Sequence, residues 1–246
     1  GHIELASPVF HIGRLPRFQH TRSLLTDSRS GFLSRIKKFL EIVCHNCGKI
    51  LADESDVDFR EALTIKDVKR RFDGIWKACK DKRYCATSVA EDDDMQSKKS
   101  KGPVFDHGGC GNRHPQIRRV GLGFQGTWKA EKESGQPDEV KAITPAMVLN
   151  IFKHISDEDI LKIGLTPQDA RPERMVVTVL PVPPPPVRPS ISIDGTGHGM
   201  RGEDDLTYKL GDIIRASGAL RRAEAEGAPG PPIADHEQLL QFHVAT

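Results

Sequence analysis

Hydrophobic residues recur at helical spacing in two stretches of the first third of the chain. From Phe32 to Val43 they lie three or four positions apart, with basic residues between them, which is the repeat of a helix that buries one face. Residues 65–80 carry a second such stripe, which includes Phe72 and Ile75. The two apolar faces are expected to pack in a common core.

Shorter segments have the pattern of strands. Residues 1–13 alternate weakly between apolar and polar positions, and residues 116–120 and 126–129 are short runs that follow a glycine-rich turn. Residues 175–180 are apolar and rich in β-branched side chains, which predicts a buried strand.

Two further helices are predicted from their N-terminal signals. Thr144 can cap a helix that starts at Pro145, because a proline in the first turn removes no hydrogen bond that the helix needs. The acidic run at residues 157–159 suits the positive N-terminal end of another short helix.

The end of the chain predicts two helices around a turn. Apolar positions recur at helical spacing at Leu206, Leu210, Ile213 and Leu220, and again at Leu239, Leu240, Phe242 and Val244. Residues 223–232 between them are rich in Gly and Pro and cannot be helical throughout. Residues 206–246 are therefore expected to form an antiparallel helical hairpin.

The remaining segments are polar or proline-rich. Residues 14–31 and 86–103 are polar inserts expected at the surface, and residues 190–205 form a Gly-rich polar loop. Residues 181–189 hold a proline run that is expected to be extended polyproline II and to act as a strut, although such a run could also bind an aromatic groove. The predicted fold class is α+β: an irregular domain of short strands and several helices that ends in the hairpin.

Composition narrows the possible functions. The 246 residues include 36 basic and 34 acidic side chains, so any nucleic-acid contact must come from a local patch. The basic runs at residues 35–38 and 70–71 are either solvated helix faces or such patches. No apolar run approaches the roughly 20 residues of a membrane helix, so no membrane partner is expected. The chain begins without Met or a secretory signal, which fits a fragment of a larger protein.

The five cysteines carry the clearest chemical signal. Cys44 and Cys47 form a Cys-x-x-Cys pair followed by glycine, which can grip one tetrahedral zinc ion. Cys110 lies in a Gly-Gly-Cys-Gly turn and Cys85 follows a helix end, whereas Cys79 lies on the apolar side of a helix and is interpreted as a core residue. The predicted ligands are Cys44, Cys47, Cys85 and Cys110.

Four thiolates would make a closed, structural zinc site. With no open position for water and no His-Glu-x-x-His motif, a zinc hydrolase is disfavoured. Two alternatives remain open: the cysteines are ordinary buried thiols, or His45, His107 or His114 replaces one of them as a ligand.

Several longer motifs resemble the largest subunit of eukaryotic RNA polymerase II. They occur in the order of that family and span the chain: GHIELA at 1–6, VCHNCGK at 43–49, GGCGN at 108–112, LPVPPPPVRPS at 180–190, RGEDDLTYKL at 201–210 and LLQFHVAT at 239–246.

The resemblance implies a role in the clamp that closes over the DNA–RNA hybrid. It places the clamp core and head at residues 1–189, the lid at 190–205 and the clamp coiled coil at 206–246. The same four cysteines match the clamp zinc site of the family. The implied partners are other polymerase subunits (especially the second-largest), template DNA, nascent RNA, and initiation and elongation factors at the hairpin tip. The implied location is the nucleus.

In and beside the lid, four residues could meet nucleic acid: Arg188, Ile193, His198 and Arg201. The alternative for each is a loop residue that contacts only solvent or its own loop. The catalytic magnesium motif of this nucleotidyltransferase is absent from the sequence, so Mg²⁺ is expected only in the full enzyme. The acidic run at 92–94 lies in a polar insert and is no substitute.

Two features separate this chain from the family pattern. The family's first clamp zinc site lies mostly before Gly1, and residues 14–31 have no counterpart, which indicates either a lineage-specific loop or a retained intron. The main rival function is a free-standing zinc-binding module that reads a protein partner through the terminal hairpin.

Overall fold

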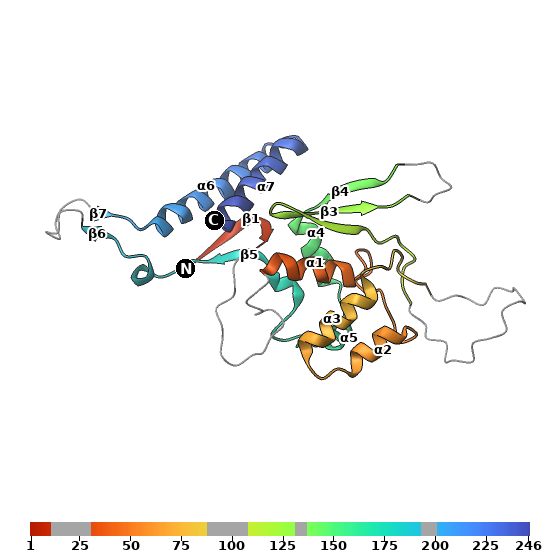
Figure 1. Ribbon diagram of the computed structural model, residues 1–246. Helices are drawn as coiled ribbons and strands as arrows, with labels where there is room; N and C mark the ends of the chain where they lie inside the picture. Colours follow the sequence, from red (N-terminus) through yellow and green to blue (C-terminus); the bar gives the residue numbers. More distant parts are fainter. Residues whose placement is uncertain (11–30, 88–107, 131–136, 193–200) are drawn as a thin grey trace, which may run out of the picture. The chain divides into compact units, whose positions relative to one another are not determined.

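The computed structural model describes residues 1–10, 31–87, 108–130, 137–192 and 201–246 (Figure 1). The chain divides into two compact units. One unit contains residues 13–175, and the other combines residues 1–12 with residues 176–246. The inserts predicted at 14–31 and 86–103 lie almost entirely outside the described residues.

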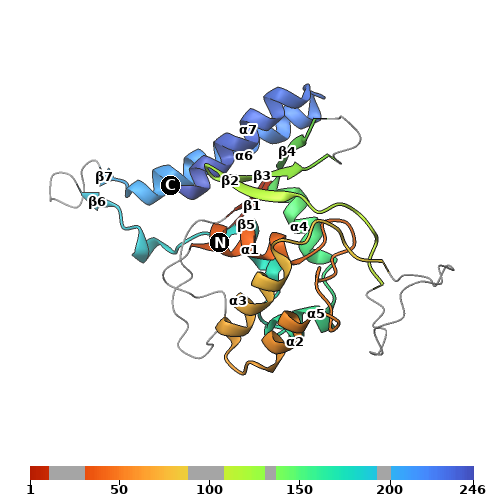
Figure 2. The same ribbon diagram turned by 45° about the vertical axis from the view of Figure 1, so that its right-hand side comes forward.

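The unit of residues 13–175 is built from helices and one small sheet. Its helices are α1 (Phe32–Ile42), α2 (Val57–Thr64), α3 (Val68–Cys79), α4 (Pro145–Lys153) and α5 (Asp157–Ile163), followed by the 3₁₀ helix η2 (Pro172–Met175). Its strands are β2 (Gln116–Val120), β3 (Gly123–Trp128) and β4 (Glu139–Ile143), paired antiparallel in the order β2-β3-β4 (Figure 2).

The core of this unit forms where α1, α3 and α4 meet. Phe39 of α1 is fully buried, with its ring centroid 4.9 Å from that of Phe72 and 5.9 Å from that of Phe152. These residues belong to the apolar stripes that the helical spacing predicted, so this part of the prediction is confirmed.

Capping side chains explain where helices α3 and α4 begin. Thr144 Oγ1 accepts a hydrogen bond from the Met147 backbone N–H at 3.3 Å, which confirms the predicted start of α4. The helix predicted over 65–80 starts instead at Val68, because the Asp67 carboxylate caps it. Helix α2 and strand β4 are not in the prediction; both are short and lack a strong apolar period.

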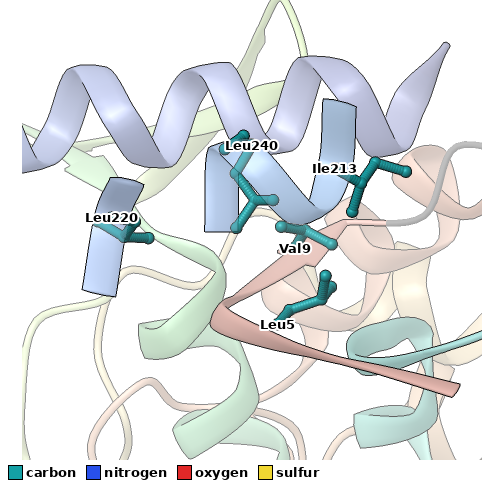
Figure 3. Packing of buried hydrophobic residues seen from close by; sticks show 6 residues of the cluster. Leu5, Val9, Ile213, Leu220 and Leu240 are labelled. Atoms are coloured by element: carbon teal, nitrogen blue, oxygen red, sulfur yellow. The ribbon is translucent and has the colours of Figure 1, made fainter. Parts of the chain in front are cut away.

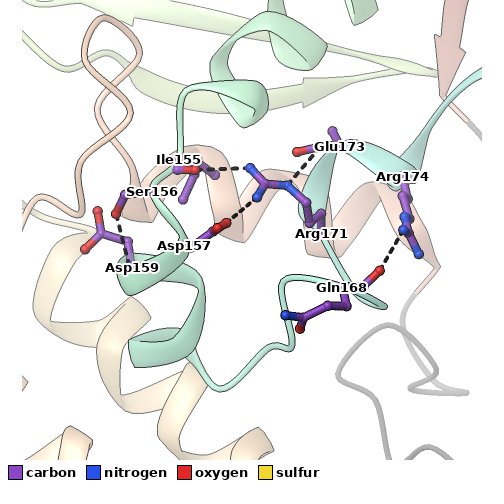
Figure 4. A network of polar contacts seen from close by, with 8 residues as sticks. All are labelled: Ile155, Ser156, Asp157, Asp159, Gln168, Arg171, Glu173 and Arg174. Atoms are coloured by element: carbon purple, nitrogen blue, oxygen red, sulfur yellow. Dashed lines mark hydrogen bonds and ion pairs between the residues drawn. The ribbon is translucent and has the colours of Figure 1, made fainter.

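A network of polar contacts ties α5 to η2 (Figure 4). The Arg171 guanidinium pairs with Asp157, with Glu173 Oε1 at 2.9 Å, and with the Ile155 carbonyl oxygen at 3.2 Å. Ser156 caps α5 by accepting a hydrogen bond from the Asp159 backbone N–H at 3.1 Å. The acidic run at the start of α5 thus has the helix position that the sequence predicted.

The other unit is a two-stranded ribbon with a helical hairpin packed on it. Strand β1 (His2–Phe10) pairs antiparallel with β5 (Val176–Pro181), and α6 (Asp205–Ala225) packs along α7 (Gly230–Ala245). Both helices contact β1 through a cluster of buried side chains: Leu5, Val9, Ile213, Ala216, Leu220 and Leu240 (Figure 3). The predicted hairpin is therefore present, and the α+β fold class is confirmed.

The buried residue Gln241 of α7 joins the hairpin to the ribbon through hydrogen bonds of its side-chain amide. Gln241 Oε1 accepts from the Phe10 backbone N–H at 2.6 Å, and Gln241 Nε2 donates to the Phe10 carbonyl oxygen at 2.7 Å. The Ser217 hydroxyl oxygen accepts from the Ala6 backbone N–H at 2.9 Å. These side chains thus hydrogen-bond to backbone groups of β1 at Ala6 and Phe10.

Two predictions about the segment before the hairpin are wrong. The strand β5 is mostly not buried, because it belongs to a ribbon of two strands only; Val179 is 46% exposed. The proline run is not extended throughout, because η3 (Pro185–Val187) makes a 3₁₀ turn. Proline fixes φ near a value that both conformations share, so the ring alone does not select polyproline II.

The ends of the polar loop at 190–205 are paired. Strands β6 (Ile191–Ser192) and β7 (Arg201–Gly202) form a short antiparallel ladder. None of the helices that the structure describes combines the length and the hydropathy of a membrane span.

Candidate metal centre

Four cysteine sulfur atoms gather at one point of the unit of residues 13–175. The Sγ atoms of Cys44, Cys47, Cys85 and Cys110 all lie within 4.8 Å of one another. Cys44 Sγ is 3.5 Å from Cys110 Sγ, and Cys47 Sγ is 3.6 Å from Cys85 Sγ. Both distances are far longer than the roughly 2.05 Å of a disulfide bond.

These distances fit a tetrahedral thiolate site. A Zn–S bond of about 2.3 Å places two sulfur ligands of one tetrahedron about 3.8 Å apart. The four sulfurs can therefore hold a metal ion such as zinc with small adjustments of their side chains. Within the described ranges, no other group of three or more His, Cys, Asp or Glu residues is arranged to hold a metal.

The first cysteine pair sits in a tight turn that follows α1. The Cys44 backbone N–H donates to the Lys49 carbonyl at 2.8 Å, and the Gly48 N–H donates to the Cys44 carbonyl at 3.0 Å. Gly48 has φ +75°, and a Cβ atom there would lie 2.5 Å from the His154 carbonyl oxygen. The glycine after the Cys-x-x-Cys pair is thus required both by the turn and by its neighbour.

The second pair is held by two short segments that pair with each other. The Cys85 N–H donates to the Asn112 carbonyl at 3.0 Å, and the Gly111 N–H donates to the Cys85 carbonyl at 3.0 Å. Beside them, Tyr84 and Arg113 form an antiparallel bridge. These backbone bonds fix Cys85 relative to Cys110, although the two are far apart in the sequence.

Hydrogen bonds and burial set the acidity of the thiols. Burial raises the pKa of Cys44 and Cys85 above the usual thiol value. Burial also acts to raise the pKa of Cys110, but hydrogen bonds from the Asn112 backbone and side chain and from neighbouring groups outweigh it and lower the pKa to about 6. A bound metal would replace the thiol protons, so metal binding here would release protons.

The fifth cysteine is separate from the cluster. Cys79 is fully buried at the end of α3, and burial raises its pKa to about 12, so it remains a neutral thiol. This environment agrees with the interpretation of Cys79 as a core residue.

Two of the three histidines proposed as rival ligands, His45 and His114, are not part of the sulfur group. His45 and His114 stack edge to face with ring centroids 4.8 Å apart, and His45 Nε2 lies 3.0 Å from the Leu40 carbonyl oxygen. Burial lowers the pKa of His45 to about 4 and that of His114 to about 3, so both rings are neutral at pH 7. His107 lies outside the described residues.

Of the four residues named in or beside the lid, the structure describes Arg188 and Arg201. Arg188 is half-buried and donates to the Pro183 carbonyl at 3.0 Å and to Thr207 Oγ1 at 3.3 Å. Arg201 is exposed and donates to the Ser190 hydroxyl and carbonyl oxygens at 3.1 and 3.0 Å. Ile193 and His198 lie outside the described residues.

Of the two basic runs predicted as possible patches, the run at residues 35–38 is engaged within the unit, and at residues 70–71 the Arg71 side chain donates to the Ile65 carbonyl at 2.8 Å while Arg70 is exposed. Lys37 pairs with Glu41 at 3.3 Å and Lys38 with Asp73 at 2.7 Å, while the buried Arg35 lies over the Phe72 ring. A different set of cations, Arg83, Arg113 and Lys129, lies near the sulfur cluster, and the sequence pattern did not single it out. Arg83 and Arg113 could have been noticed because they lie two and three residues from Cys85 and Cys110 in the sequence.

The chain thus combines a mixed α+β fold with a knuckle, formed by Cys44, Cys47, Cys85 and Cys110, that can hold a metal ion. Comparison with protein families identifies it further: the model for RNA polymerase Rpb1, domain 1, matches residues 1–246, the whole chain. The chain belongs to this family. It is therefore part of the largest subunit of a DNA-directed RNA polymerase, a multisubunit enzyme of transcription that binds DNA and RNA.

Proposed function

We propose that this chain forms most of the clamp of the largest subunit of RNA polymerase II, helps to hold the DNA–RNA hybrid and acts in mRNA synthesis. The observation that carries the proposal is the family match over all 246 residues. In this assignment, residues 1–189 form the clamp core and head, 190–205 the lid and 206–246 the clamp coiled coil.

The proposed cofactor is one structural zinc ion held by Cys44, Cys47, Cys85 and Cys110. Their sulfur atoms have the separations of a tetrahedral set, and four thiolates leave no position for a reactive water. A bound zinc ion would cross-link segments that are distant in the sequence, and it would catalyse no reaction. The Mg²⁺ ion of nucleotide addition is assigned to other parts of the polymerase.

At the lid, Arg201 is the better candidate for a phosphate contact. Its guanidinium is exposed and uses only part of its five donors on Ser190. Arg188 is proposed to position the lid more than to bind RNA, because it links the proline turn to Thr207 at the start of α6. Ile193 and His198 remain proposed nucleic-acid contacts of the same loop.

The hairpin is proposed to dock transcription factors in the nucleus. The exposed apolar side chains of the hairpin support a protein partner: Leu206, Tyr208, Ile214, Leu239 and Phe242. The remaining surface of the chain is proposed to contact the second-largest subunit. The rival function, a free-standing zinc module that binds proteins through the same hairpin, makes no template-directed RNA.

Affinity purification of the native protein separates these functions. A tag on the endogenous protein is expected to recover the second-largest polymerase subunit, identified by mass spectrometry, together with template-dependent RNA synthesis. Benzophenone placed at position 201 is expected to cross-link to nascent RNA in a stalled elongation complex, whereas benzophenone at position 226, at the end of α6, is the control. Recovery of the protein without polymerase subunits or RNA synthesis contradicts the proposal.

A further inference from the structure

A basic cavity lies beside the sulfur cluster in the unit of residues 13–175. It has a volume of about 410 Å³ and is lined by the segments at 80–84, 113–116 and 127–130. Five of its lining residues are cationic: Lys80, Lys82, Arg83, Arg113 and Lys129. A single lining residue, Asp81, is acidic.

The charges of this cavity are only partly neutralised by the protein itself. Lys82 pairs with Asp56 at 2.9 Å, and Lys80 lies over the Trp76 ring. Within the part of the chain that the structure describes, Arg83, Arg113 and Lys129 are exposed and form no ion pair. Three cations from separate segments thus converge on one opening, which favours a polyanion as ligand.

An aromatic ring stands among these cations. Tyr84 lines the cavity and is 47% exposed. It forms an antiparallel bridge with Arg113, and directly opposed residues of such a bridge lie on the same face. An exposed ring next to arginines is the arrangement that binds single strands, because unpaired bases stack on the ring while the cations follow the phosphates.

The cavity wall is continuous with the metal knuckle. The His114 N–H donates to the Arg83 carbonyl at 2.6 Å, and the next pair along, Cys85 with Asn112, holds one of the four sulfurs. The segments that carry Arg83 and Arg113 are therefore fixed to each other next to Cys85. A metal that cross-links the cysteines also holds the two arginines at one separation.

We propose that this cavity binds a segment of single-stranded nucleic acid, with Arg83, Arg113 and Lys129 on consecutive phosphates and a base stacked on Tyr84. The inference rests on the proposed polymerase function and adds a binding site to it that is separate from the lid. The site recognises phosphodiester and a base face rather than a base sequence. It also makes strand binding depend on the metal.

Fluorescence anisotropy with a labelled dT₁₂ oligonucleotide tests the proposal on the zinc-loaded whole chain. The test variant is Arg83→Gln with Arg113→Gln, and the control is Arg60→Gln with Lys153→Gln, which removes two exposed cations from helices α2 and α4. Two lost phosphate contacts are expected to lower the salt slope by about 1.4 and the affinity by about 20-fold at 0.1 M salt. The control is expected to bind as the wild type does.

Tyr84→Leu tests the stacking contribution separately. It is expected to weaken dT₁₂ binding at least about fivefold and to leave the salt slope unchanged, because no charge is lost. If the first double variant fails to fold by circular dichroism, Arg83→Gln with Lys129→Gln replaces it, since Lys129 lies outside the Tyr84–Arg113 bridge.

Competition identifies the source of the bound phosphate. Unlabelled dT₁₂ is expected to compete, whereas inorganic phosphate and polyglutamate at equal charge are expected not to. Equal competition by either one overturns the proposal, because the site would then take a small anion or an acidic protein. If the double variant binds dT₁₂ as the wild type does, the strand binds elsewhere and the proposed site is wrong. That result leaves the proposed polymerase function intact. Absence of dT₁₂ binding by the wild type also overturns the proposed site, whereas failure of the polymerase function would appear in the subunit purification.

Discussion

Replacement of Cys47 by Ser tests whether a metal ion holds the knuckle together. The substitution removes one of four sulfurs that lie within 4.8 Å of one another. A hydroxyl is a poor substitute, because zinc in closed sites prefers thiolate and the remaining three ligands leave one position to water. Cys47→Ser is therefore expected to lose tight zinc binding.

The size of the effect follows from binding linkage. With free zinc buffered at 1,000 times its dissociation constant, an ion that binds only the folded chain stabilises it by about 4 kcal/mol. For a domain of this size, such a stabilisation corresponds to a rise in Tm of about 8–16 °C. The wild type is expected to show this zinc-dependent rise, and Cys47→Ser is expected to show almost none.

Cys79→Ser is the matched control. Cys79 is fully buried and outside the sulfur group, so its replacement puts a hydroxyl into an apolar site and costs about 1–3 kcal/mol with or without zinc. Its zinc content is expected to stay at one ion per chain.

The assay combines zinc content by inductively coupled plasma mass spectrometry with thermal unfolding at two buffered zinc concentrations. One zinc per chain in Cys47→Ser, with a wild-type rise in Tm, refutes the assignment of Cys47 as a ligand. Loss of zinc in Cys79→Ser alone refutes the choice of the four cysteines.

Three more predictions concern stability. Phe39→Ala is expected to cost about 3–5 kcal/mol in urea unfolding, because the ring is fully buried among aromatic neighbours; a cost below about 1 kcal/mol would contradict this packing. Gln241→Ala is expected to cost about 2–4 kcal/mol and to speed amide exchange at Phe10, since it removes both hydrogen bonds that the Gln241 side chain makes to the Phe10 backbone; unchanged exchange would argue against the contact. The His114 pKa is lowered to about 3 by burial, so the contribution of His114 to stability, fully present above pH 6.5, is expected to fall by about 1.4 kcal/mol per pH unit as the pH drops toward 4, and His114→Phe should reduce the slope of stability against pH by that amount in the metal-free chain.

Local chemistry allowed much of the secondary structure to be predicted. The helix at Pro145 follows from one threonine cap and one proline, and α1 and α3 follow from apolar side chains at steps of three and four. The α6–α7 hairpin follows from two stripes and a Gly/Pro break. These signals act within a few residues, so they can be seen in one sequence.

The sequence did not predict the structure of segments that are short or whose residues suit more than one conformation. Helix α2 and strand β4 carry few buried side chains and depend on their neighbours for stability. The proline run fixes φ but leaves ψ free to differ, and only the folded chain decides that Pro185–Val187 make a turn.

For the metal centre, the sequence by itself determined the chemistry and the structure decided the positions. Cysteine spacing and flanking glycines indicated four thiols and set Cys79 apart, because ligand type and turn geometry are local properties. Only tertiary structure brings Cys85 and Cys110 to the first pair, through backbone bonds between segments distant in the chain. The same long-range pairing gathers Arg83, Arg113 and Lys129 around one cavity, which no sequence period could show because the three residues come from separate segments.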